Sequence, residues 1–186
     1  MTPLLGMMAS GATGSKQSSY ESIASATGTG VGGTILFSSI PATYQHLQLR
    51  CLVSDTYTAS DGAQEGWLQF NSDTASNYSY HRLNGNGSTA SASGVASNTV
   101  MDNQISIAYG TTGAFGVAII DIQNYASTTQ YKTVRSFNGS DLNGSGYVRL
   151  ASGNWRSTSA ISSITIGGTI TAFTTTSQFA LYGIKG

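Results

Sequence analysis

Three acidic side chains in one expected loop are the first candidate for chemistry. The stretch SDTYTASDGAQE contains Asp55, Asp61 and Glu65, and carboxylate oxygens are the ligands that calcium prefers. The spacing differs from that of an EF-hand loop, in which ligands alternate and a glycine occupies the sixth position. We therefore expect a solvated loop, and we leave calcium binding there as an open alternative. Since no His or Cys cluster has zinc spacing and no G-x-x-x-x-G-K phosphate loop occurs, the sequence predicts no other metal site and no cofactor.

The residues that could catalyse a reaction do not form a recognisable set. The two histidines, His46 and His81, both fall in expected strands, and no G-x-S-x-G nucleophile elbow is present. Glycoside hydrolysis needs two carboxylates at opposite faces of a sugar, whereas turn aspartates such as those here usually bond their own backbone. Cys51 is the only cysteine and lies in an apolar stretch, so we expect it to be buried and unpaired. The sequence therefore predicts no enzymatic activity.

The composition favours a folded protein whose partners are other proteins. Only 9% of the 186 residues are charged, against roughly 25% in ordinary soluble domains. Eight basic residues balance eight acidic ones, which removes the electrostatic attraction that nucleic acid or an anionic membrane would require. No stretch approaches the roughly 18 to 20 apolar residues of a membrane span. We expect no nucleic-acid and no membrane partner, and near-neutrality promotes self-association.

Clusters of β-branched and aromatic residues separated by small polar runs predict an all-β fold. In HLQLRCLV, apolar and other residues alternate with a period of two, which is typical of a strand with one buried face. A series of short strands with turn signals between them predicts a single jelly-roll-like antiparallel β sandwich. Eleven strands are expected, at residues 20–26, 33–37, 46–53, 66–71, 78–83, 104–110, 115–125, 131–138, 146–152, 161–168 and 177–186.

Residues 84–99, NGNGSTASASGVASNT, have no periodic apolar pattern. We expect them to form a long loop, which is uncommon in a compact domain unless it has a function or lies against a neighbour. This segment is therefore a candidate contact loop.

Three stretches near the ends of the chain form a recognisable set: YESI near residue 20, FSSIPATYQHLQLR at residues 37–50, and SQFALYGIKG at residues 177–186. With them, the chain resembles a family of small structural proteins of tailed bacteriophage virions. The start LLGMMASG is also similar to the short apolar beginnings of these proteins, whereas residues 54–176 fit only in general style. The resemblance implies a jelly-roll-like sandwich located on a virion and without enzymatic activity.

The stretch SIPATY is expected to be the corner at which the chain leaves one sheet. Pro41 fixes φ and cannot donate to a strand ladder. Ile40 and Tyr44 would then fill the corner, and Leu47 would begin the next strand.

An extended N-terminal arm, residues 1–16, is expected to precede the sandwich domain, residues 17–186. Four apolar side chains could anchor this arm on a neighbouring capsid or tail subunit, because burying one such side chain stabilises by roughly 1.5 to 3 kcal/mol. They are Leu4, Leu5, Met7 and Met8.

Taken together, these features favour a head decoration or cement protein on the outside of the capsid. It would bind the major capsid protein as a homotrimer. The alternative is a tail fibre or tail-tip module that binds a tail protein and recognises a host surface glycan. A hydrolase of host envelope polymers is disfavoured because the catalytic constellations are missing.

Overall fold

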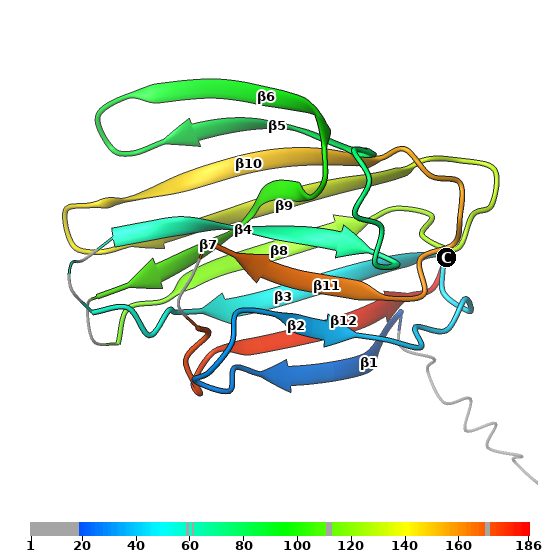
Figure 1. The fold of residues 1–186 in the computed structure, drawn as a ribbon, viewed down its shortest axis with the longest axis horizontal. Coiled ribbons are helices and arrows are strands. Elements are labelled where there is room, and N and C mark those ends of the chain that lie inside the picture. The colour runs from blue at the N-terminus through cyan, green and yellow to red at the C-terminus, as the bar shows by residue number, and fades with distance from the viewer. Residues whose placement is uncertain (1–18, 59, 61, 111–112, 170–171) are drawn as a thin grey trace, which may run out of the picture.

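The computed structural model describes residues 19–186 except 59, 61, 111–112 and 170–171, and this part of the chain folds into two β-sheets packed face to face (Figure 1). The strands are β1 (Tyr20–Thr27), β2 (Ile35–Phe37), β3 (His46–Val53), β4 (Gly62–Phe70), β5 (Tyr78–Gly85), β6 (Ala90–Asn98), β7 (Met101–Tyr109), β8 (Gly116–Ile122), β9 (Lys132–Asp141), β10 (Gly146–Trp155), β11 (Ile164–Gly168) and β12 (Gln178–Ile184). No helix among the described residues is long and apolar enough to cross a membrane.

The strand order confirms the predicted jelly-roll-like sandwich. The large sheet has the order β1-β12-β3-β8-β9-β10-β5-β6, and the small sheet has the order β2-β11-β4-β7. All named pairs are antiparallel, and β3, β4 and β5 pair in turn with β12, β11 and β10. The chain is thus doubled back on itself and rolled into two layers, as in a jelly roll.

The apolar core lies between the two sheets, and on the large sheet it is formed by β12, β3, β8, the beginnings of β5 and β9 and the end of β10. Leu47, Leu49 and Cys51 point inward from β3, and Arg50 is exposed on the other face, as the alternation predicts. Cys51 is buried as expected, and burial raises the pKa of its thiol.

The prediction of a long loop over residues 84–99 is wrong. Residues 90–98 form β6, which pairs with β5 in a hairpin. The carboxamide oxygen of Asn86 closes the turn by accepting bonds from the backbone N–H groups of Ser88 and Thr89 at 3.1 and 2.9 Å. A hydrophobic alternation is missing because β6 has no buried face: eight of its nine residues are exposed.

The SIPATY stretch connects β2 of the small sheet to β3 of the large sheet. Ile40 is buried, and the Tyr125 hydroxyl donates to the carbonyl oxygen of Pro41. The Tyr44 ring covers Gly183 of β12, where a Cβ would lie 2.3 Å from the ring. Leu47 follows as a fully buried residue of β3. Leu4, Leu5, Met7 and Met8 of the predicted arm lie outside the described residues.

Candidate functional site

In part of the large sheet, the usual arrangement of side chains in a β sandwich is reversed: polar side chains are buried and apolar ones are exposed. On β9, Ser136 and Asn138 are buried between the sheets, whereas Phe137 is exposed. On β10, Arg149 is buried and its neighbours Val148 and Leu150 are exposed. Since successive strand residues point to opposite faces, these strands direct polar groups inward and apolar groups into solvent.

The exposed apolar side chains gather on one surface because the strand register aligns them. Ile119, Phe137, Leu150 and Leu83 lie directly opposite one another on β8, β9, β10 and β5. Their exposed fractions are 45%, 59%, 50% and 55%. Val117 and Val148 lie in the adjacent row, on either side of Gly139. These six side chains are called the outer apolar face below.

Covering the outer apolar face would release considerable free energy. Fully burying one large aliphatic or aromatic side chain stabilises by roughly 1.5 to 3 kcal/mol. The six residues are about half exposed, so covering all of them would contribute about 4 to 9 kcal/mol before the entropy cost of association. Contiguous apolar patches of this kind on soluble proteins mark interaction sites.

An open groove of about 710 Å³ lies at one end of this face. Its floor contains Val117, Ile119, Phe137 and Val148, and its walls come from the β5–β6 turn and the β9–β10 turn. Both turns are rich in glycine and small polar residues. The groove therefore combines an apolar floor with a rim of backbone and side-chain hydrogen-bonding groups.

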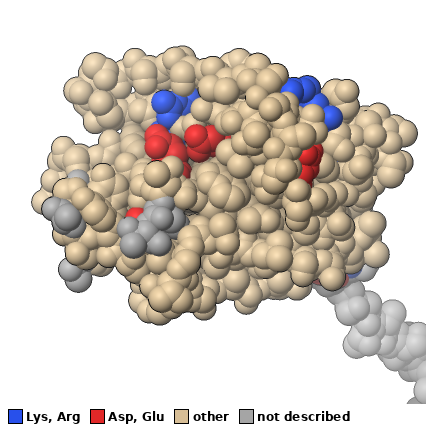
Figure 2. Space-filling view, viewed as in Figure 1, with Lys and Arg blue, Asp and Glu red and all other residues tan. Residues whose placement is uncertain are grey.

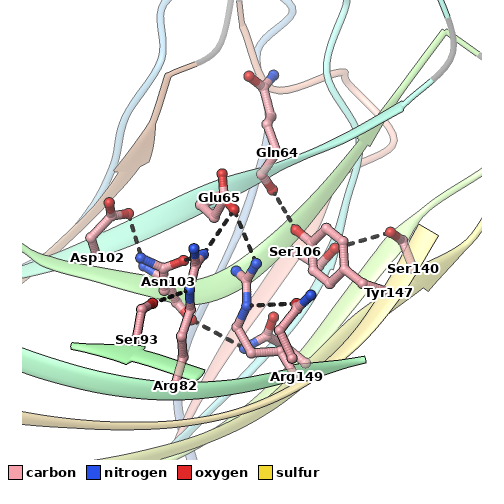
Figure 3. A network of polar contacts seen from close by, with 12 residues as sticks. Gln64, Glu65, Arg82, Ser93, Asp102, Asn103, Ser106, Ser140, Tyr147 and Arg149 are labelled. Atoms are coloured by element: carbon pink, nitrogen blue, oxygen red, sulfur yellow. Dashed lines mark hydrogen bonds and ion pairs between the residues drawn. The ribbon is translucent and has the colours of Figure 1, made fainter. Parts of the chain in front are cut away.

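Beneath the outer apolar face, a layer of polar groups joins the two sheets (Figure 3). Glu65 of β4 accepts hydrogen bonds from Arg82 of β5 and Arg149 of β10 at 3.2 and 3.0 Å. The Arg149 side chain is 2% exposed, whereas that of Glu65 is 38% exposed. The Arg149 guanidinium also stacks on the Tyr147 ring, 4.4 Å from the ring centre. One carboxylate thus pairs with two guanidinium groups at the edge of the sandwich.

The rest of the layer consists of neutral groups that bond one another across the sheets. Ser106 of β7 donates to the Ser140 hydroxyl at 3.1 Å, and Ser136 donates to the carbonyl oxygen of Gln104. Buried polar atoms of Gln104, Asn138 and Arg149 have no hydrogen-bond partner within the described chain. Each such atom costs roughly 1 to 3 kcal/mol. The inside-out arrangement therefore lowers the stability of the isolated protein. This points to an interaction with another molecule as the reason for the arrangement.

Charge is scarce elsewhere on the face that carries the small sheet. Figure 2 shows that most of this face is neither basic nor acidic, and that most of its few charged side chains gather in two groups in the upper half of the view. Asp102 of β7 lies close to the polar layer around Glu65, and burial raises the pKa of its carboxyl group. The surface thus offers little to steer a charged ligand.

Asp55 and Glu65, two of the three acidic residues predicted as a possible calcium site, lie on opposite sides of β4. Gln64 donates to the Asp55 carboxylate at 2.7 Å. Glu65 is the next residue of β4 and points the opposite way, toward Arg82 and Arg149. Asp61 lies outside the described residues. Among the residues that the structure does describe, no group of three His, Cys, Asp or Glu side chains could hold a metal ion.

The two histidines lie on strands of the same sheet but far from each other. His46 begins β3, and His81 lies in β5, with β8, β9 and β10 between them. The Nδ1 atom of His46 accepts a bond from the backbone N–H of Asn124 at 3.1 Å. The His81 ring covers Gly94 of β6, where a Cβ would lie 2.5 Å from it. The structure therefore brings neither histidine to the other as a catalytic pair.

Sequence reasoning missed the outer apolar face. The signal was present as V-R-L on β10 and S-F-N on β9, in which apolar and polar residues alternate. Such alternation fixes the two faces of a strand but does not say which one is inside.

Comparisons of the chain with protein-family models, with curated proteins and with solved structures find no match.

Proposed function

We propose that this protein is a non-enzymatic structural protein of a bacteriophage virion, which decorates the outside of the capsid and cements neighbouring capsid subunits. The outer apolar face is the observation that carries this proposal. Six half-exposed apolar side chains cover four adjacent strands, while polar and charged groups occupy the interior below them. A protein that worked alone in solution would gain stability from the opposite arrangement.

The occupant of this face is a protein subunit of the virion. The face is apolar and uncharged at its centre, so it suits another protein surface better than a nucleic acid or a charged ligand. The resemblance of residues 20–53 and 177–186 to phage structural proteins supports a virion as the setting. Binding to the assembled capsid lattice stabilises it by mass action.

Capsid binding by designed variants tests the proposal. Phe137→Glu places a charge in the middle of the outer apolar face, and Thr133→Glu places the same charge on the same face of β9, outside the patch. We expect Phe137→Glu to reduce co-sedimentation with capsids at least tenfold and Thr133→Glu to leave it unchanged. Equal binding by both variants would refute the role of the face.

The groove supports a tail fibre or tail-tip module as a second candidate function. Its apolar floor could pack against one face of a sugar ring, while its rim bonds hydroxyl groups. The number of copies per purified virion, measured by quantitative mass spectrometry against the major capsid protein, separates the two functions. Hundreds of copies support decoration, whereas about a dozen trimers or fewer support a tail module.

A further inference from the structure

The β6 strand forms an unprotected edge of the large sheet. It lies at the end of the strand order beyond β5, and in Figure 1 the β5–β6 hairpin extends past the small sheet. β6 is exposed on both faces along almost its whole length. An edge strand presents a row of unpaired N–H and C=O groups, which other strands can pair with.

The residues of β6 lack the features that usually block such pairing. Natural edge strands carry charged residues, especially lysine, or proline, or they are short or covered. β6 has the sequence ASASGVASN, which contains no charged residue and no proline. A bulge, at which Ser97 has a φ of 58°, disturbs only the end of the strand. The regular part, residues 90–95, is therefore free to extend the sheet.

We infer that β6 pairs antiparallel with β6 of a second copy of this chain, which joins two large sheets into one continuous sheet. A second copy is the occupant because it presents a strand of the same length with small, uncharged side chains. Ala90, Ala92 and Gly94 face outward, and Ser91, Ser93 and Val95 face the other way. Zero net charge means that two copies do not repel each other.

Pairing through β6 also makes the outer apolar faces of the two copies continuous. The row that ends with Leu150 and Leu83 reaches Ala92 on β6. In the register that places Ala92 opposite its own copy, the row continues into Ala92 and Leu83 of the second copy. The result is one apolar band across both subunits. This inference does not rest on the proposed function, because it concerns the isolated protein.

Symmetry restricts the register of the pair. A two-fold axis perpendicular to the sheet maps each face onto itself, and successive side chains alternate between faces. The axis must therefore pass between one residue of β6 and the same residue of the second copy. For every two residues that lie opposite each other across the pair, the two residue numbers then add up to the same total. Two copies close the arrangement, so the homotrimer expected from the sequence would need a different surface.

Sedimentation equilibrium of the full chain tests the association. We expect a dimer that dissociates on dilution. Ala92→Lys and Ala92→Glu should each weaken dimerisation at least tenfold, and an equimolar mixture of the two should restore it. Ser25→Lys on β1, the other edge strand of the same sheet, is the matched control and should dimerise normally. A monomer at the highest soluble concentration, a trimer, or a dimer unaffected by Ala92→Lys would overturn the inference.

Disulfide cross-linking tests the pairing itself. Single cysteines are placed at residues 90–93 and 95, and Gly94 is omitted because a side chain there would meet the His81 ring. Each variant is oxidised alone and in mixtures with the others. We expect every cross-linked pair of residue numbers to have the same sum. Cross-links without a common sum, or their complete absence, would contradict antiparallel pairing. Deleting residues 1–16 should leave the dimer intact, and its loss would identify that segment as the occupant instead.

Discussion

Removing the charge of Glu65 should destabilise the protein more than removing the arginine that it pairs with. In Glu65→Gln, the Arg149 guanidinium stays buried but loses its counter-charge. Breaking a buried ion pair in this way costs about 3 to 5 kcal/mol. The Glu65 side chain is 38% exposed, so water screens part of this loss, and we expect about 2 to 3 kcal/mol.

Arg149→Met should cost only about 1 kcal/mol, for two reasons. It removes the buried charge together with a guanidinium nitrogen that has no partner in the described chain. Glu65 also keeps its bond to Arg82 at 3.2 Å. Because Arg149→Met removes the group that Glu65→Gln would leave unpaired, the double variant should be more stable than Glu65→Gln alone.

Urea unfolding followed by tryptophan fluorescence measures these free energies, since Trp67 and Trp155 lie in β4 and β10. At a loss of 2 to 3 kcal/mol, Glu65→Gln should lower Tm by roughly 4 to 12 °C. If Glu65→Gln stays within about 0.5 kcal/mol of the parent, or if Arg149→Met is the more damaging change, the reasoning about the polar layer is wrong.

Four further outcomes are expected. Burial raises the pKa of Asp102, so the folded state holds this proton more tightly and the charged group lowers stability at neutral pH. Asp102→Asn should therefore stabilise at pH 7, and the gain should vanish below the unfolded pKa of about 3.9, as urea titrations across pH would show. Trp155→Phe removes the bond from Nε1 to the Asp73 carboxylate at 2.7 Å, and calorimetry should show a loss of about 1.5 to 3 kcal/mol. Cys51 should react with a thiol reagent only as fast as the sheet opens, so labelling that is fast in native buffer would contradict its burial. Deletion of residues 1–16 should leave the unfolding free energy unchanged and abolish capsid binding; normal decoration of capsids by the truncated protein would refute the predicted arm.

The sequence predicted strands well where one face of the strand is buried in the apolar core. β3 shows this, because Leu47, Leu49 and Cys51 repeat every second residue and all three point inward. β6 was missed because neither of its faces is buried and its Ala, Ser and Gly residues have little intrinsic preference for strands. Hydrophobic periodicity reveals a strand only where its two faces differ in polarity, so it gives no signal for a strand whose two faces are alike.

The candidate site could not be predicted for a different physical reason. The alternation in β9 and β10 is clear, but the usual assumption puts Phe137 and Leu150 in the core and Arg149 in solvent. The structure has them the other way round. The orientation depends on Glu65 and the polar residues of β7, which are distant in sequence and accept the inward polar groups. Only the folded structure shows that the inward polar groups of β9 and β10 have hydrogen-bond partners between the sheets.

The position of β12 in the large sheet makes completion of that sheet wait until residues 178–184 have been synthesised. β12 lies between β1 and β3, so neither of these early strands has that neighbour until residues 178–184 have left the ribosome. The nascent chain must therefore hold β1 and β3 unpaired on that side while more than a hundred residues follow (about 125 from the end of β3 to the start of β12). A chain interrupted before residue 178 lacks the strand that joins β1 to β3 in the large sheet. Incomplete chains would consequently stay unfolded and be open to proteolysis.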